Sequence, residues 1–393
     1  MQSGKVIVGI DGSRAVTEQR TGTEAYAYFL ISALIPLAAE RNHTLRLYFN
    51  HPPSTGLFPE APHVETTVIP QHRLWTHTRL VRELHQNPPD VFFTPAHVIP
   101  YTYRGPSVAT IHDLGYHHFP EAHPRTQLAY LRWSTKHNGR SATRIIADSQ
   151  ATKTDLTQLD NIPTAKIDVI YPGIDPDLEP VEDEAWITAV LHKYGIIRPY
   201  FLYIGTIQPR KNLVRLVQAY ADSGVPHQLV LAGKTGWLSQ PILDETEKAE
   251  GKRQKHEAHQ KSPTSSPLTI DNSKIILPGY IDDDDKPALL SAATALLFPS
   301  LYEGFGFPAL EAQACGTPVL TSITSSMPEV VADSAILVDP LDKHAIIKAI
   351  QALASNSELC QQLTQKGFAN VNRFSWQKTA VHVLNTLESC KST

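Results

Sequence analysis

Short apolar segments alternate along this chain with longer segments in which apolar residues recur every three or four positions. The short segments are typical of buried parallel strands, and the longer ones of helices that pack on a sheet. In the first half, strands are predicted at residues 5–11, 44–49, 64–69, 91–95, 107–112, 144–149 and 167–171. This alternation predicts an α/β protein with a doubly wound parallel sheet.

The same alternation begins again at residue 200. Strands are predicted at 200–205, 228–233, 274–280, 295–298 and 335–338, and helices at 213–220, 308–315, 342–354, 358–368 and 376–389. Residues 175–184, between the two halves, are rich in proline and acidic residues, which favours a domain boundary. We therefore predict an N-terminal Rossmann-like domain over 1–175, a linker over 176–199, a second domain over 200–372 and a terminal segment over 373–393.

Three stretches stand apart from this alternation. The apolar run 25–39 contains Ser32 and Pro36 and is shorter than the roughly 20 residues that a membrane span needs, so it predicts a buried helix. Residues 71–84 predict a basic amphipathic helix, with Leu74 in its apolar stripe and Arg73 among its cations. It either packs on the core as a surface helix or contacts an anionic membrane or a phosphate-bearing acceptor. The polar segment 247–267 predicts a helix end and a loop without chemistry of its own.

Composition narrows the functional class. A chain of 393 residues is expected to form two domains, and its 41% apolar content describes a globular protein. The formal net charge of −4 argues against general binding of nucleic acid. Three cysteines without metal-ligand spacing are consistent with a reducing compartment. The first residues lack the pattern of a signal peptide, so we expect a cytoplasmic protein.

Charged residues gather at two predicted strand ends of the second half. Glu303 and Glu311 are eight positions apart, the first in a glycine-containing loop and the second about a turn into the next helix. Arg210 and Lys211 stand just before a helix start, where cations are unfavourable unless an anion joins them. Ligands of open α/β sheets bind at the carboxyl ends of the strands, so this pattern predicts a site for a diphosphate and its neighbouring hydroxyl groups.

The string EGFGFPALE from Glu303 to Glu311, followed by AQACGTPV, resembles the E-x7-E signature of retaining GT-B glycosyltransferases of family 4. The segment GTIQPRKN at 205–212 is similar to the phosphate clamp of that family, although some members carry an arginine where this chain has Thr206. The resemblance implies a GT-B fold, in which two Rossmann-like domains with doubly wound parallel sheets face each other across a cleft. It also implies that the helix within 373–393 crosses back to the N-terminal domain.

Site residues follow from the same resemblance. Glu303 would contact the donor sugar, Glu311 the nucleotide ribose, and Arg210 with Lys211 the departing diphosphate. His112, at a predicted strand end, would contact the sugar near its anomeric carbon. With Glu303, Arg210 and Lys211 it completes the candidate catalytic set. The other donor-side candidates are Gly12, Gly22, Gly205, Gly279, Tyr280, Gly304, Phe305 and Gly306, and Ser149 is the acceptor-side candidate.

The implied reaction moves a hexose from a nucleoside-diphosphate sugar to a hydroxyl of a glycan or lipid-linked acceptor, with retention of configuration, in polysaccharide biosynthesis. GDP-mannose is the favoured donor because residues 301–308 resemble mannosyltransferase-like members, and UDP-glucose is the second choice. No cofactor or metal is expected, since the acidic run 282–285 favours a helix start over a cation site. Peripheral contact with an anionic membrane at its inner face, a GT-B-shaped nucleotide-sugar epimerase and a non-catalytic sugar- or partner-binding protein stay open.

Overall fold

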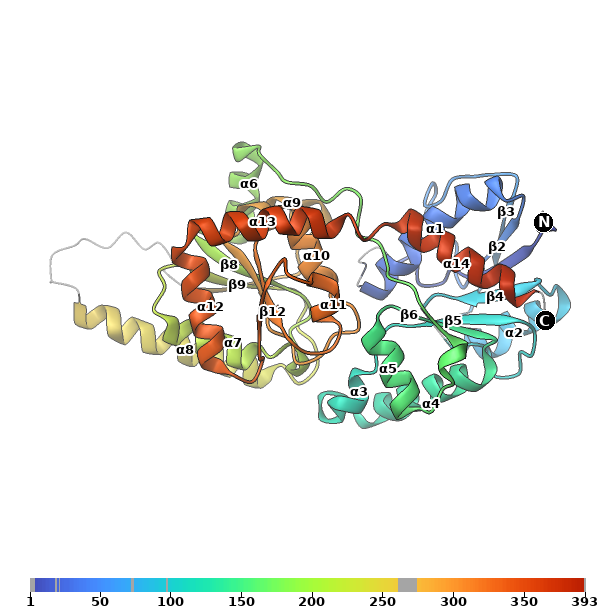
Figure 1. Cartoon of the computed structure of the whole chain (residues 1–393), viewed down its shortest axis with the longest axis horizontal. Helices are drawn as coiled ribbons and strands as arrows, with labels where there is room; N and C mark the ends of the chain where they lie inside the picture. Colours follow the sequence, from blue (N-terminus) through green and yellow to red (C-terminus); the bar gives the residue numbers. More distant parts are fainter. Residues whose placement is uncertain are drawn as a thin grey trace. The chain divides into compact units, whose positions relative to one another are not determined.

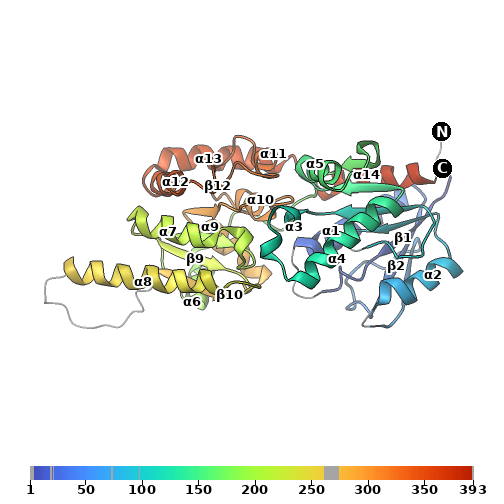
Figure 2. The same ribbon diagram turned by 90° about the horizontal axis from the view of Figure 1, so that it is seen from below.

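The structure is a computed structural model that describes residues 4–17, 20, 22–71, 74–96, 98–260 and 274–391, with the backbone alone described for 251–260. The chain divides into two compact units. Unit 1 comprises Met1–His117, Pro124–Ile174 and Phe374–Thr393, and unit 2 comprises His118–His123 and Asp175–Arg373. Figures 1 and 2 show the helices and strands of both units from two directions.

Unit 1 is built on a seven-stranded sheet in the order β3-β2-β1-β4-β5-β6-β7. Its strands are β1 (Ile7–Asp11), β2 (Thr44–Phe49), β3 (Val64–Val68), β4 (Val91–Thr94), β5 (Ser107–Ile111), β6 (Arg144–Ala147) and β7 (Ile167–Val169). All neighbouring strands pair in parallel, with β1 between β2 and β4. The strand order reverses between β1 and β4, so the predicted doubly wound sheet is confirmed.

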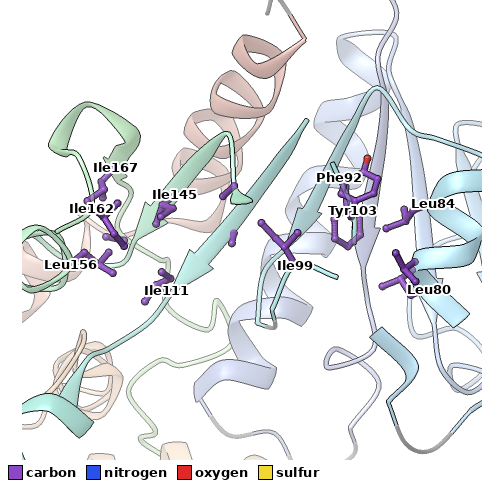
Figure 3. Close-up of a cluster of buried hydrophobic side chains, with 14 of the residues drawn as sticks. Leu80, Leu84, Phe92, Ile99, Tyr103, Ile111, Ile145, Leu156, Ile162 and Ile167 are labelled. Carbon is purple, nitrogen blue, oxygen red and sulfur yellow. The ribbon is translucent and has the colours of Figure 1, made fainter. Parts of the chain in front are cut away.

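Helices cover both faces of this sheet. One side carries α2 (Val81–Gln86), α4 (Arg125–Ser141) and α5 (Gln150–Leu159). Figure 3 shows the core beneath them, where Leu80 and Leu84 lie near Phe92 and Leu156 lies near Ile145. Successive strand residues point to opposite faces, so each buried strand contributes side chains to two cores.

The other side carries α1 (Gly22–Glu40) and α14 (Trp376–Cys390), which pack against each other. Arg41 and His43, just after α1, both contact Glu388 of α14, at 3.0 and 2.7 Å. Lys391 Nζ donates to the carbonyl oxygen of Lys5 at 2.8 Å. The last helix of the chain is therefore an integral part of the unit that holds the first strand.

Helix α1 contains the long apolar run. Its buried residues include Tyr26, Leu30, Ile31 and Leu34, which lie in the core of unit 1. Among the described residues it is the one helix whose length and composition would also suit a membrane span, a test that core helices pass as well. Its packing against α14 confirms the prediction of a buried helix.

The segment 71–84 differs from the single helix that was predicted. Leu74 is 72% exposed with a φ of 56°, and the chain becomes helical only at Trp75, through the π-helical turn η1 (Thr76–Leu80) into α2. Trp75 and Leu80 are buried, so the apolar stripe packs on the core. The prediction of a surface helix holds from Trp75 onward, while Arg73 lies outside the described residues.

Unit 2 has a six-stranded sheet in the order β10-β9-β8-β11-β12-β13. Its strands are β8 (Tyr200–Ile204), β9 (Gln228–Ala232), β10 (Ile275–Gly279), β11 (Ala295–Phe298), β12 (Val319–Ser322) and β13 (Ile336–Val338). All neighbours are again parallel, and the order reverses between β8 and β11. Ligands of doubly wound sheets bind beyond the carboxyl ends of the strands at such a reversal.

The helices of unit 2 form two groups by their contacts. Helix α7 packs against α8 and α12, and α10 packs against α9 and α13. Their bounds are α6 (Glu184–Tyr194), α7 (Leu213–Ser223), α8 (Gln240–Gln260), α9 (Lys286–Ala292), α10 (Phe307–Ala314), α11 (Met327–Val331), α12 (Lys343–Ser355) and α13 (Ser357–Val371). Helix α8 extends to Gln260, within the segment 247–267 where a helix end and a loop were predicted, and the remainder of that segment lies outside the described residues.

Candidate functional site

Two loops meet at the strand reversal of unit 2. The first runs from β8 through η4 (Pro209–Lys211) into α7, and the second from β11 into α10. The backbone N–H of Leu301 donates to the carbonyl oxygen of Arg210 at 3.0 Å. The side-chain amide of Asn212 donates to the carbonyl oxygen of Pro299 at 3.0 Å. These bonds hold the loops together and bring their charged side chains into contact.

Three of the predicted residues form one charge cluster: Arg210, Lys211 and Glu303. Lys211 Nζ lies 2.6 Å from Glu303 Oε1, and Arg210 Nη1 lies 3.3 Å from Glu303 Oε2. Lys211 Nζ also sits 4.9 Å from the centre of the Phe298 ring. Glu303 and Lys211 are buried. Burial opposes ionisation of the Glu303 carboxyl, but Lys211 and Arg210 outweigh it and hold its pKa below the ordinary value.

The charge cluster revises the expectation that Arg210 and Lys211 have no anion of their own. Two cations before a helix start were expected to need a diphosphate. In the structure Glu303 already supplies them with an anion. Two positive charges against one negative still leave an excess of one positive charge beside the start of α7. Arg210 also donates to the carbonyl oxygen of Tyr302, which fixes the orientation of its guanidinium.

Two serines that the sequence argument missed hold the backbone of the Glu303 loop. Ser325 Oγ accepts from the N–H of Glu303 at 2.8 Å. Ser326 Oγ lies 3.0 Å from the carbonyl oxygen of Glu303 and 2.9 Å from that of Phe305. Their signal in the sequence is a pair of hydroxyl residues shortly after the segment that forms β12, where side chains cap loops. The carboxylate of Glu303 is therefore carried on a rigid backbone.

Gly306 allows the same loop to enter α10. Its φ of 104° is one that residues with a Cβ rarely adopt, and a Cβ there would lie 2.5 Å from Met327 Sδ. Gly304 and Phe305 complete the turn, with the Phe305 ring buried and 5.2 Å from that of Phe307. A larger residue at Gly306 would displace the turn that bears Glu303.

Glu311 has a different partner. It lies within α10, and its Oε1 is 3.3 Å from Lys286 Nζ at the start of α9. Burial alone would lower the pKa of Lys286, but Glu311 together with Asp283 and Asp175 outweighs it and the pKa is raised. Lys286 was not among the predicted site residues, although a lysine at a helix start is the same signal that identified Arg210 and Lys211. The second carboxylate thus belongs to a separate ion pair.

Glycines end three adjacent strands of unit 2. Gly205 follows β8, Gly233 follows β9 and Gly279 ends β10. Gly233 has a φ of 143°, and a Cβ on it would lie 2.0 Å from the carbonyl oxygen of Gly205. Its N–H donates to the carbonyl oxygen of Gly279 at 2.7 Å. A glycine at position 233, which was not predicted as a site residue, therefore allows its backbone to lie this close to those of Gly205 and Gly279. Next to it, Lys234 Nζ lies 4.8 Å from the centre of the Tyr280 ring.

His112 of unit 1 is held by acceptors on both ring nitrogens. Nδ1 is 2.6 Å from Asp148 Oδ2, and Nε2 is 2.8 Å from the carbonyl oxygen of Pro95. Two acceptors require two N–H donors, which only the protonated ring has. Burial opposes protonation, but Asp148 outweighs it and raises the pKa of His112. The structure therefore presents His112 as an imidazolium.

Asp148 is the clearest residue of unit 1 that the sequence argument missed as a site residue. It is buried, and its Oδ1 has no hydrogen-bond partner among the described residues. Tyr26 of α1 packs edge-on against His112 with ring centres 4.8 Å apart. The only sequence signal of Asp148 is its place near the end of the strand predicted at 144–149, which many other residues share. The pairing of His112 with Asp148 joins the ends of two adjacent strands, β5 and β6.

The remaining predicted residues of unit 1 have local structural contacts. Ser149 Oγ accepts from the N–H of Thr152 at 3.0 Å and so caps α5. Gly12 follows β1, and a Cβ on it would lie 2.5 Å from Phe49 Cε1. Gly22 begins α1. Their contacts with a donor or an acceptor stay predictions, and the structure assigns Ser149 a capping role as well.

The acidic run 282–285 and Cys315 have structural contacts. Among the described residues, no three His, Cys, Asp or Glu side chains are grouped as metal ligands. The acidic run 282–285 instead forms the turn before α9, where Asp282 and Asp285 bind Lys193 at 2.8 and 2.6 Å. Cys315 is buried, and burial raises the pKa of its thiol to about 12, so it packs as a core residue.

Comparisons with known proteins identify relatives of both parts of the chain. The family description "Glycosyltransferase Family 4" matches residues 21–178, and "Glycosyl transferases group 1" matches residues 195–370. The O-antigen chain mannosyltransferase B of Escherichia coli is 32% identical over 300 residues, which cover 72% of this chain and 73% of that protein.

Solved structures share the fold of the whole chain. The sucrose-phosphate synthase of Thermosynechococcus elongatus superposes with a TM-score of 0.71 at 22% identity, over 98% of this chain and 99% of that one. HepE of Anabaena, in complex with UDP-glucose, does so with a TM-score of 0.70 at 19% identity, over 98% and 99%.

Proposed function

Because this chain belongs to the group 1 glycosyltransferases of family 4 and has their GT-B fold, we propose that it transfers mannose from GDP-mannose to a hydroxyl of a growing glycan, with retention of configuration. The relative from Escherichia coli, named an O-antigen chain mannosyltransferase, supports the choice of sugar and acceptor. Its identity of 32% extends over both halves of the chain, so the support is not confined to the nucleotide-binding part.

The observation that carries the proposal is the charge cluster at the strand reversal of unit 2. Its two cations exceed its single carboxylate, and it lies at the start of α7. Both the excess charge and the helix dipole favour an anion there. Arg210 can bind two phosphate oxygens through its planar fork, and Lys211 acts as a point charge. A nucleoside diphosphate is the leaving group that such a cluster would neutralise.

The carboxylates would hold the neutral parts of the donor. Glu303 accepts hydrogen bonds, so it can orient hydroxyls of the mannose while remaining ionised between its two cations. Glu311, which contacts Lys286, would accept hydrogen bonds from the ribose hydroxyls. Fixed polar groups that are placed where charge develops stabilise the transition state by about 3 kcal/mol each in enzymes where this has been measured.

The proposed transfer breaks the bond between the anomeric carbon and the diphosphate oxygen. The acceptor oxygen forms its bond to the same face of that carbon, and its proton passes to the departing phosphate oxygen. His112 is not the base in this scheme, because as an imidazolium it has no free lone pair to accept a proton. Its positive charge would attract the anionic diphosphate of the donor and would repel the positive charge that develops on the sugar ring.

Calorimetry against GDP-mannose, UDP-glucose, UDP-N-acetylglucosamine and ADP-glucose tests the donor. We expect GDP-mannose to bind, and Lys211→Ala and Glu311→Ala each to weaken it by at least tenfold, a loss of about 1.4 kcal/mol. Lys348→Ala, a change of an exposed lysine on α12, is the matched control. Binding of UDP-glucose alone would identify UDP-glucose, and not GDP-mannose, as the donor. Folded protein that binds none of the four would contradict the proposal.

The acceptor and the alternatives are tested by product analysis. Incubation with GDP-mannose and a mannose-containing oligosaccharide should give an elongated product with the anomeric configuration of the donor, as read by NMR. An epimerase would instead consume the donor without any acceptor and yield a different nucleotide sugar. A non-catalytic binding protein would leave both compounds unchanged.

A further inference from the structure

Helix α4 carries a basic stripe beside an aromatic stripe on its outer surface. The basic stripe consists of exposed residues at helical spacing: Arg125, Arg132, Lys136 and Arg140. Tyr130, Trp133 and His137, spaced three and four residues apart, form the stripe next to it, because such spacings return to one side of a helix. The helix contains no acidic residue.

Aromatic side chains from two other segments join the second stripe. Tyr101, in the loop between β4 and β5, lies 5.5 Å from the ring of His137 and 6.4 Å from that of Trp133. His77 of η1 meets Trp133 edge-on at 5.7 Å. Trp133 and His137 are themselves stacked at 5.3 Å. The rings therefore form one contiguous cluster on three neighbouring segments.

This cluster is on the surface and not in the core. Tyr101 is 57% exposed, Tyr130 49% and Trp133 39%. The opposite side of the same layer is already packed, since Leu128 and Leu131 of α4 lie against the core shown in Figure 3. Folding of unit 1 thus buries one side of α4 and leaves large aromatic rings at the solvent.

Three further exposed cations lie on the segments that carry His77 and Tyr101. Arg79 and Arg82 are exposed on η1 and α2, and Arg104 is exposed in the loop of Tyr101, whose carbonyl oxygen its Nη1 contacts at 2.9 Å. Within the part of the chain that the structure describes, none of these three or of the four on α4 forms an ion pair with a carboxylate. The chain as a whole has a net charge of −4, so this concentration of unpaired cations is local.

We propose that this surface, called here the α4 face and made of the two stripes of α4 with Tyr101, His77, Arg79, Arg82 and Arg104, binds an anionic membrane surface. Unpaired Lys and Arg are attracted to anionic headgroups, and Trp and Tyr rings prefer the boundary between headgroups and acyl chains. A neutral glycan could pack on the aromatic rings but would leave the seven cations without a partner anion. The proposal does not depend on which sugar is transferred.

Sedimentation with vesicles tests the proposal on the full chain. Vesicles of phosphatidylcholine with phosphatidylglycerol should bind the protein, and vesicles of phosphatidylcholine alone should not. Each Lys or Arg near an anionic surface contributes a factor of roughly five to partitioning, so Arg132→Gln with Lys136→Gln should lower the partition coefficient roughly 30-fold. Trp133→Ser should lower it too but leave its dependence on salt unchanged, because the lost contact is apolar.

The matched control is Lys248→Gln with Lys348→Gln, which removes two exposed lysines of unit 2 and changes the net charge equally. This control should bind vesicles like the unchanged protein, and circular dichroism should show all variants folded. Absence of vesicle binding, equal binding to both vesicle types or an equal loss in the control would overturn the proposal. Sedimentation velocity that shows Trp133-dependent self-association in place of vesicle binding would assign the α4 face to a second copy and overturn it as well.

Discussion

Replacing Glu303 by glutamine should lower stability and yet strengthen the binding of a free nucleoside diphosphate. The substitution keeps the shape of the side chain but removes the charge that lies 2.6 Å from Lys211 Nζ and 3.3 Å from Arg210 Nη1. Removing one partner of a buried ion pair costs about 3–5 kcal/mol. In a domain of this size that corresponds to a fall of roughly 6–20 °C in melting temperature.

The effect on binding has the opposite sign. A phosphate oxygen about 2.8 Å from Lys211 Nζ would lie no more than about 5.4 Å from Glu303 Oε1, since the lysine is 2.6 Å from that oxygen. At an effective dielectric constant of about 20, two unit charges at that distance repel by about 3 kcal/mol. Without Glu303 this repulsion is gone, so the dissociation constant for GDP should fall by roughly 100-fold.

Calorimetry with GDP and thermal unfolding followed by circular dichroism measure the two effects. Glu311→Gln is the control, because Glu311 contacts Lys286 and not the charge cluster, so this change should weaken GDP binding. Transfer by Glu303→Gln should still be slow, because the sugar is no longer oriented. Unchanged or weaker binding of GDP by Glu303→Gln would refute the assignment of Arg210 and Lys211 to the diphosphate.

The stability effect should also depend on pH. The folded pKa of Glu303 is lowered, so its contribution is complete above the unfolded value of about 4.3 and disappears as the pH falls through the folded value. Urea unfolding should therefore show a large difference between the unchanged protein and Glu303→Gln at neutral pH and a shrinking one in acid. A difference that stays constant down to about pH 2 would show that the charge is not the cause.

Three further predictions concern single contacts. His112→Gln should destabilise most below about pH 6.5, and the difference should narrow as the pH rises through the raised pKa of His112, as read by urea unfolding at about pH 6 and pH 9. Gly233→Ala should lower the free energy of unfolding by more than about 4 kcal/mol because its Cβ would lie 2.0 Å from a carbonyl oxygen. Gly224→Ala, also at positive φ but in open space, should lower it by about 1 kcal/mol, and thermal unfolding followed by circular dichroism compares the two variants. Ser149→Ala should lower unfolding free energy by about 1 kcal/mol through loss of the α5 cap, and no loss would show that water replaces it.

The sequence predicted elements better than it predicted partners. Buried strands and amphipathic helices leave local patterns, so β8 and α7 begin where they were expected. The pairing of Lys211 with Glu303 joins residues 92 positions apart, and only the strand order brings their loops together. Both residues were identified, but the carboxylate was expected to face a sugar and the lysine a phosphate. Periodicity contains no signal for the contact between them.

Burial was harder to predict than helix formation. Leu74 was assigned to an apolar stripe and is instead 72% exposed, because the chain before Trp75 turns through a positive φ. Conversely, Tyr130, Trp133 and His137 have the spacing of a core stripe but lie at the surface. Helical spacing says which side chains share a face, and only packing decides whether that face meets the core.

The contact of α14 with α1, and of Lys391 with Lys5, bears on how the protein is made. Unit 1 contains both ends of the chain, and Asp175–Arg373 of unit 2 is inserted between its parts. Domains usually fold as they leave the ribosome, earliest first. Here the first part of unit 1 must wait for α14, and the surface that α14 will cover stays exposed while Asp175–Arg373 is being made. The inserted unit can be complete sooner, so the order of synthesis is not the order of folding.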